Sequence, residues 1–221
     1  MHFNKIFQKI YQIILKIGMI VLFILLTNSN YSQTISENGW KLAKDKQDIQ
    51  IYTRQMANSK LKELRAHTYI KTSVDSVITT LQDVDNYYKW MVYIKNSALL
   101  KKISDDELYI YSEAKLPWPF SNRDITNHIN VYWSEEKDTA TLFIDGIPDY
   151  IPEKEGIVRM PISKGHWYVY QLDKQTTKIE YIYGGDPGGS IPSWIVNMFI
   201  VDGPYKSLVN LKRYLEIKSV E

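Results

Sequence analysis

Hydrophobic and polar residues alternate in two long parts of the chain, residues 49–70 and 97–183. Strict alternation places successive side chains on opposite faces of an extended strand, so it predicts β-structure. In the first part, the turn-like residues 57–59 separate two alternating stretches and predict a hairpin. In the second part the connections are short, which favours an antiparallel meander because parallel strands need long crossovers. Its strands are expected at 107–116, 123–133, 139–145, 156–162, 166–172 and 178–183.

Two helices are expected beside these strands. Thr72 or Ser73 is a suitable N-cap for a helix over residues 74–84, where apolar residues recur at helical spacing. Pro192 stands where a second helix begins, and Gly203–Pro204 is expected to kink or split that helix. A wide apolar stripe predicts that the second helix covers something large and apolar. The stripe comprises Ile195, Met198, Phe199, Val201, Tyr205, Leu208, Val209, Leu211 and Leu215.

These elements predict an α+β fold in which a curved antiparallel sheet is closed by one long C-terminal helix. Such a sheet encloses either a solid core or a cavity, and alternation is compatible with both, because it leaves the register of the strands open. The aromatic cluster at 87–93 is typical of plain core.

The first 33 residues differ from the rest of the chain. Lys5, Lys9 and Lys16 precede the apolar run 17–26, and a polar segment follows it, which is the layout of a secretory signal peptide. The run is shorter than the about 20 residues that a membrane-spanning helix needs. We therefore expect an exported protein, periplasmic or secreted, with a signal peptide at 1–33 and a single domain at 34–221. The alternative is an uncleaved N-terminal membrane anchor.

Charge and composition exclude several classes of function. The leader carries three lysines and no acidic residue, so its removal changes the formal net charge from +2 to −1. A near-neutral domain without basic runs lacks the electrostatic footprint of nucleic-acid binding. The chain has no cysteine, hence neither a disulfide nor a thiolate nucleophile. His67, His128 and His166 lie at no metal-ligand spacing, and His128 is expected on a solvent-facing side, so no metal, cofactor or catalytic residue is predicted.

One charged residue is expected to face the interior. Arg123 begins the strand 123–133 and shares a face with Asn127 and with the apolar residues at 125, 129, 131 and 133. A guanidinium in apolar surroundings is costly unless it is paired. Two partners are open at this point: an aspartate or glutamate of a neighbouring strand, or the anionic group of a ligand.

A hydrophobic ligand needs apolar area for its tail and one charge or hydrogen bond to fix its head. The mouth of such a site is expected near the turn 117–122 and the C-terminal helix, where exposed rings could also meet a membrane. The candidate ligand-binding residues are Arg123, Asn127, Trp90, Trp118, Phe120, Trp167, Trp194 and Met198.

Three motifs carry a resemblance to a known family. With Pro-Phe-Ser-Asn-Arg-Asp at 119–124, Trp90 before it and Asp-Pro-Gly-Gly-Ser-Ile-Pro-Ser-Trp at 186–194, the chain resembles the START (steroidogenic-acute-regulatory-related lipid transfer) family over residues 40–215. The resemblance implies a helix-grip fold, in which the sheet wraps around the long C-terminal helix with an internal hydrophobic cavity. It implies binding and transfer of a lipid or other hydrophobic molecule, by a monomer that contacts membranes transiently.

The alternative is an enzyme of the wider helix-grip superfamily, such as a cyclase, an aromatase or a hydrolase acting on a hydrophobic substrate. Arg123 would then hold a carboxylate or enolate. The lack of a general base on an inward face counts against this alternative.

Overall fold

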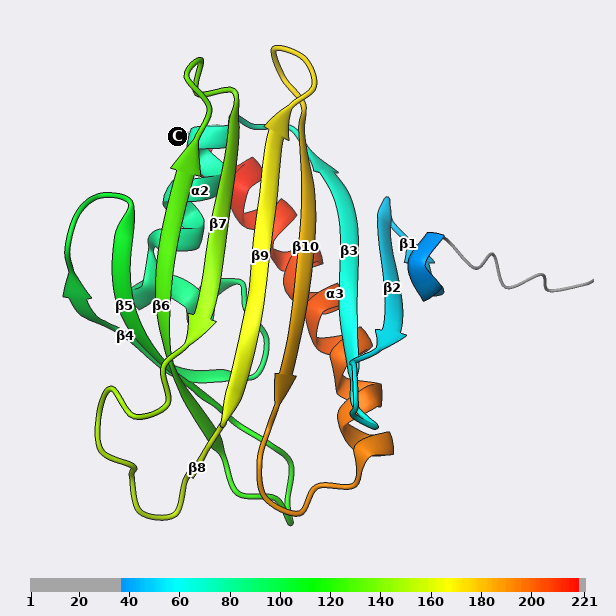
Figure 1. Cartoon of the computed structure of the whole chain (residues 1–221). Coiled ribbons are helices and arrows are strands. Elements are labelled where there is room, and N and C mark those ends of the chain that lie inside the picture. The colour runs from blue at the N-terminus through cyan, green and yellow to red at the C-terminus, as the bar shows by residue number, and fades with distance from the viewer. Residues whose placement is uncertain (1–36, 219–221) are drawn as a thin grey trace, which may run out of the picture. The chain divides into compact units, whose positions relative to one another are not determined.

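One curved sheet of ten strands forms most of the structure, a computed structural model that describes residues 37–218 (Figure 1). The strand order is β1-β2-β3-β10-β9-β7-β6-β5-β4, and every pair along this path is antiparallel. The expected meander is therefore confirmed, and β10 closes it against β3 of the first hairpin. The strands are β1 (Lys41–Lys46), β2 (Ile49–Gln55), β3 (Lys62–Ile70), β4 (Ile94–Lys102), β5 (Glu107–Ala114), β6 (Arg123–Trp133), β7 (Thr139–Gly146), β8 (Val158–Arg159), β9 (Ile162–Gln171) and β10 (Thr177–Asp186).

The helices lie on one face of this sheet. In the view of Figure 1 both α-helices lie behind the strands, so the outer face of the sheet is turned to the reader. The first begins where a cap was expected: the Ser73 hydroxyl accepts a hydrogen bond from the Ser76 backbone N–H at 3.2 Å. The sheet and the long last helix together form the predicted α+β helix-grip arrangement. The helices are α2 (Val74–Gln82) and α3 (Ser193–Lys218), with short 3₁₀ turns η1 (Glu37–Gly39) and η2 (Val84–Lys89).

The strand expected at 156–162 is wrong. The chain forms only the two-residue strand β8 there, which pairs parallel with β6, and β9 begins at Ile162. Pro161 explains the interruption, because a proline cannot donate to a strand ladder. Residues 147–157 instead form a loop, and its carbonyl groups at 148, 151 and 152 accept hydrogen bonds from Arg159.

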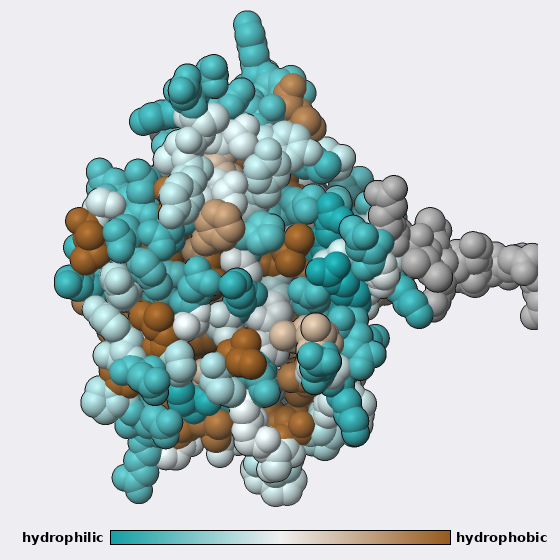
Figure 2. Space-filling model, in the orientation of Figure 1, coloured by the Kyte–Doolittle hydropathy of each residue, from teal (hydrophilic) through white to brown (hydrophobic). Residues whose placement is uncertain are grey.

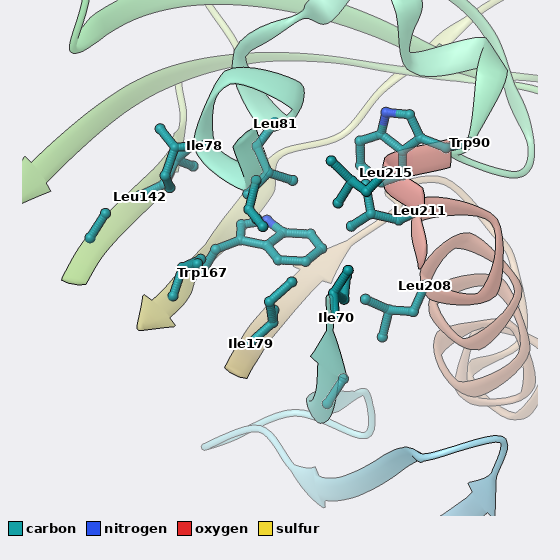
Figure 3. Close-up of a cluster of buried hydrophobic side chains, with 14 of the residues drawn as sticks. Ile70, Ile78, Leu81, Trp90, Leu142, Trp167, Ile179, Leu208, Leu211 and Leu215 are labelled. Carbon is teal, nitrogen blue, oxygen red and sulfur yellow. The ribbon is translucent and has the colours of Figure 1, made fainter. Parts of the chain in front are cut away.

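A solid hydrophobic core occupies one end of the space between sheet and helices (Figure 3). Ile78 and Leu81 of α2 meet Trp167 of β9 there, and the last turns of α3 close the cluster from the other side. Burial of such side chains is worth about 1.5–3 kcal/mol each, so this end of the molecule carries much of its stability. The α3 residues in the cluster are Leu208, Leu211 and Leu215, and the strands add Ile70, Leu142 and Ile179.

The long helix is not split at Gly203–Pro204, because α3 is continuous from Ser193 to Lys218. Its buried residues all lie at or after Gly203, and none lies in the ten residues before it. Among residues 37–218, no helix has the length and apolarity needed to cross a membrane.

The outer face of the sheet is mixed in character. Figure 2 shows hydrophobic side chains there as separate groups among hydrophilic ones. His128 lies on this face, as expected, but it is half-buried: its Nε2 is 2.8 Å from Oε1 of Glu107 and its ring stacks on Tyr109.

Candidate functional site

A cavity of about 350 Å³ lies between the concave face of the sheet and the first half of α3. This volume falls within the about 300–1,000 Å³ typical of small-molecule pockets. Its walls come from the inward faces of β5, β6, β7 and β10, from the segment 90–94 after η2, and from α3. The sequence left open whether the sheet encloses a solid core or a cavity. The structure has both, with a solid core at one end and a cavity beside it.

Strand β6 forms a long wall of this cavity. Arg123, Ile125, Asn127 and Ile129 all line it, as the alternation predicted. Six residue steps of an antiparallel strand span about 20 Å, so the cavity is elongated along β6. The residues between them point to the outer face, where Asp124 is buried under the loop 147–157.

The cavity lining is almost entirely apolar. Arg123 is the only charged side chain among the residues that line it, and no aspartate, glutamate or histidine is among them. Several of the lining hydroxyls are already engaged: Tyr87 donates to the Leu81 carbonyl at 2.6 Å, and Ser207 accepts from the Val92 N–H at 3.1 Å. The described residues hold no cluster of side chains suited to a metal ion.

Arg123 is buried, with 4% of its surface exposed, and it makes hydrogen bonds only to neutral groups. Its Nε donates to the Pro187 carbonyl at 2.9 Å. Its Nη1 donates to the Ser121 carbonyl at 2.6 Å, and its Nη2 donates to the Gly188 carbonyl at 3.2 Å. Within residues 37–218 no carboxylate forms an ion pair with it. Burial accordingly lowers the pKa of Arg123 below its ordinary value.

These bonds fasten two loops to each other, the turn 117–122 and the segment 187–189. Gly189 has φ +66°, a left-handed conformation that favours glycine. A side chain there would also place its Cβ 3.0 Å from the Arg123 Nη2 atom. The glycines of the Gly-Gly pair therefore let the backbone approach the guanidinium closely.

The ion pair that was one alternative for Arg123 does not form among residues 37–218, but a different arginine is paired on the other face of β6. Arg159 of β8 binds Asp124 through two hydrogen bonds, Nε to Oδ1 at 2.8 Å and Nη2 to Oδ2 at 3.1 Å. Both side chains are almost fully buried. The hydrogen bond to Asp124 raises the pKa of Arg159, so this guanidinium stays charged.

Asn127 is the second polar residue of the β6 wall. Only 7% of its surface is exposed, and its Oδ1 atom is buried without a hydrogen-bond partner among the described residues. Trp90 also lines the cavity, and its buried indole N–H has no hydrogen-bond partner among the described residues either.

The structure brings four of the predicted site residues together and leaves four outside the cavity. Arg123, Asn127, Trp90 and Trp167 line it, and the Trp167 ring stacks on Tyr181 with centroids 4.0 Å apart. The four that do not line the cavity are Trp118, Phe120, Trp194 and Met198.

The prediction that Met198 is buried on the inner face of the C-terminal helix is wrong, since 55% of Met198 is exposed. The face toward the cavity runs through Val196, Ile200, Gly203 and Ser207, which recur at helical spacing. Gly203 and Ser207 are small because α3 approaches the segment 90–94 closely there. The predicted stripe is therefore correct in part: Phe199 and Leu208 line the cavity, and Leu211 and Leu215 are buried. Gly203 and Ser207 carry no hydrophobic signal, so the stripe does not include them.

The sequence of this chain is similar to that of known proteins. The model of the START domain family matches residues 25–215. An uncharacterized protein of Pseudomonas aeruginosa is 34% identical over 177 residues, which are 80% of this chain and 87% of that protein. The phosphatidylcholine transfer protein of Rattus norvegicus is 28% identical over 176 residues, 74% of this chain and 78% of that protein.

Solved structures agree with these relatives. The crystal structure of a fragment of a STAR-related lipid transfer protein from Xanthomonas axonopodis superposes with a TM-score of 0.75 at 36% identity, covering 81% of this chain and 99% of that one. The human StAR-related lipid transfer protein 5 has a TM-score of 0.72 at 15% identity, covering 94% and 99%. At that identity the second likeness concerns the fold alone.

Proposed function

This chain belongs to the START domain family, and from that membership we propose that it binds a lipid or another hydrophobic molecule in the cavity beside β6. One observation carries the proposal: the cavity has an apolar lining and a single charged group, Arg123. An apolar pocket with few oriented polar groups is the arrangement that binds a tail by area and a head by one directed contact.

The ligand's head is proposed to be anionic. Three of the five N–H donors of a guanidinium are accounted for by Pro187, Ser121 and Gly188, all of them neutral acceptors. A buried cation without a counterion is unfavourable, and a carboxylate or phosphate supplies that counterion with two oxygens that fit the planar fork of the guanidinium.

We propose further that the protein carries its ligand between membranes as a monomer. A lipid tail costs about 0.8 kcal/mol per CH₂ in water, so transport through solvent requires a shielded cavity. The loops that Arg123 joins lie at the lower end of the molecule in Figure 1, near the start of α3. Trp118 and Trp194 are exposed in this part of the chain, and such rings favour the membrane interface. Entry of a ligand there requires the first half of α3 or a neighbouring loop to shift.

The lining also favours binding over the enzyme alternative. General acid–base catalysis uses a carboxylate, an imidazole or a similar group within reach of the substrate, and the cavity lining holds no carboxylate or imidazole. Arg123 can hold an anion, but the lining residues give it no partner of this kind for moving a proton.

Export is proposed together with this function, with residues 1–33 as a signal peptide that directs the domain 34–221 to the periplasm or the outside. Those first residues lie outside the described part of the chain, and the proposal rests on their sequence alone. Intact mass of the protein expressed with its leader tests it. A mass that starts near Gln33 or Thr34 supports cleavage, and a full-length product in the membrane fraction contradicts it.

The binding proposal is tested with stearate and with stearyl alcohol, which has the same tail and no charge. The wild type is expected to bind both in a fluorescence displacement titration. Arg123→Leu should weaken stearate binding at least about tenfold, or about 1.4 kcal/mol, and leave stearyl alcohol unaffected. Arg123→Lys keeps the charge and should retain part of the preference for stearate. A wild type that binds neither contradicts the function, and equal loss of both ligands contradicts the head-group assignment.

A further inference from the structure

Asn127 is an unpartnered amide in the middle of an apolar wall. Its neighbours on the inner face of β6 are Ile125 and Ile129, and all three line the cavity. The oxygen is buried and accepts no hydrogen bond, and the amide nitrogen donates none to any residue between 37 and 218. A buried amide without partners is unfavourable, and most buried polar groups in folded proteins have a partner. A leucine has the same branched shape and the same number of side-chain heavy atoms without that cost, so stability alone does not account for the amide.

We propose that Asn127 hydrogen-bonds a second polar group of the ligand, so that the preferred ligand is an anionic amphiphile with a hydroxyl or carbonyl group within its chain. The inference rests on the proposed function, because it places that ligand along β6 with its head at Arg123. A primary amide has both a donor and an acceptor, so it can bind either kind of oxygen.

The position of Asn127 says where the second polar group lies. Four residue steps separate it from Arg123, which is about 13 Å along an antiparallel strand. The second group is therefore well separated from the head and lies part of the way along the tail. Beyond it the wall is apolar again at Ile129, and Leu142 and Trp167 continue it.

Such a site also rejects ligands. A site built to hydrogen-bond a ligand discriminates strongly against the analogue that lacks the group, because its own buried polar atoms stay unpaired. Asn127 is thus a specificity-determining residue: plain saturated chains leave its amide without a partner, and chains with a correctly placed oxygen do not.

Stearate and a series of its monohydroxy derivatives test this inference, with the hydroxyl moved carbon by carbon along the chain. The wild type should bind the best mid-chain derivative about tenfold more tightly than stearate, and derivatives hydroxylated next to the carboxylate should show no such gain. In Asn127→Leu the preference should disappear, with stearate bound at least as tightly as by the wild type. Asn130→Leu, the same change on the outer face of β6, should keep the preference.

Each outcome is decisive. Equal affinity of the wild type for stearate and every derivative overturns the role of Asn127 while leaving the proposed function intact. A preference that persists in Asn127→Leu overturns it as well. Failure of the wild type to bind any of these amphiphiles overturns the proposed function and the inference together. Thermal unfolding of Asn127→Leu is the folding control, and its midpoint should equal or exceed that of the wild type because an unpaired buried amide has been removed.

Discussion

Arg123 and Asp124 are neighbours in the chain, but they lie on opposite faces of β6 and differ in their partners. On the outer face, Asp124 and Arg159 form a buried pair with two hydrogen bonds, and the carbonyl groups of the loop 147–157 accept from the remaining N–H groups. On the inner face, Arg123 has only neutral carbonyl partners and borders the cavity. The outer site is saturated and has nothing left to bind, whereas the inner site keeps an uncompensated charge beside an apolar space.

The difference separates a contribution to stability from a contribution to binding. A buried charge with a complete set of partners holds elements together, here β8 and its loop against β6. A buried charge with an incomplete set is less favourable for the free protein and becomes favourable when an anion arrives.

The largest effect is expected from Arg159→Leu. It leaves the Asp124 carboxylate, 1% exposed, without its counterion, and breaking such a pair costs about 3–5 kcal/mol of unfolding free energy. Arg123→Leu should cost clearly less, because it strands no charge. Urea denaturation of both variants measures the two free energies of unfolding. Lys164→Ala is the control: it removes an exposed ion pair, so it should change the stability by at most about 0.5 kcal/mol. Equal losses at 123 and 159 would show that both arginines are structural.

A second comparison, between the two halves of α3, predicts the next effect. Leu211 is fully buried in the solid core, so Leu211→Ala should lose about 2–5 kcal/mol. Ile200→Ala lies on the same helix but faces the cavity and is only partly buried, so its loss should stay under about 2 kcal/mol while ligand retention falls. Chemical denaturation and native mass spectrometry of the two variants provide the measurements. Similar stability losses would mean that the cavity is filled by side chains in solution.

The sequence predicted much of this fold because its local signals agree. Alternation located the strands, Ser73 marked the start of α2, and the face of β6 placed Arg123 and Asn127 inside. The partners of Arg123 could not be predicted, since Pro187 and Gly188 lie more than sixty residues away and reach it only through strand register. The cavity face of α3 was predicted only in part: Phe199 and Leu208 of the apolar stripe line the cavity, but close approach selects Gly203 and Ser207, which carry no hydrophobic signal.

Acid should lower the stability of the protein through Glu113, a buried carboxylate on the outer face of the sheet. Glu113 lies beside the turn that leads to Arg123. Burial by itself raises the pKa of this carboxyl, but hydrogen bonds from Lys95, Asn96 and Asn122 outweigh it and hold the pKa below the ordinary value of 4.5. A lowered folded-state pKa means that the stabilisation is present above pH 4.5 and is lost as the pH falls through the folded value. Stability measured from about pH 7 to about pH 3 should therefore drop less steeply in Glu113→Gln than in the wild type. Parallel profiles would assign the acid sensitivity to other groups.

The smallest effect is expected at Trp118, which is 93% exposed on the turn 117–122. Trp118→Ala removes almost no buried area, so the melting temperature should stay unchanged, in contrast to the arginine variants. If the ring rests in the membrane interface and holds the mouth there, transfer of a fluorescent lipid between vesicles should slow, by less than about tenfold, because one ring lowers the barrier by less than about 1.4 kcal/mol. Tyr132→Ala is the matched control: this ring is also exposed, but it lies near the other end of β6, about 30 Å away along the strand, and its loss should leave transfer unaffected. Equal slowing by both variants would contradict a membrane contact at the turn 117–122 and place that contact elsewhere on the surface.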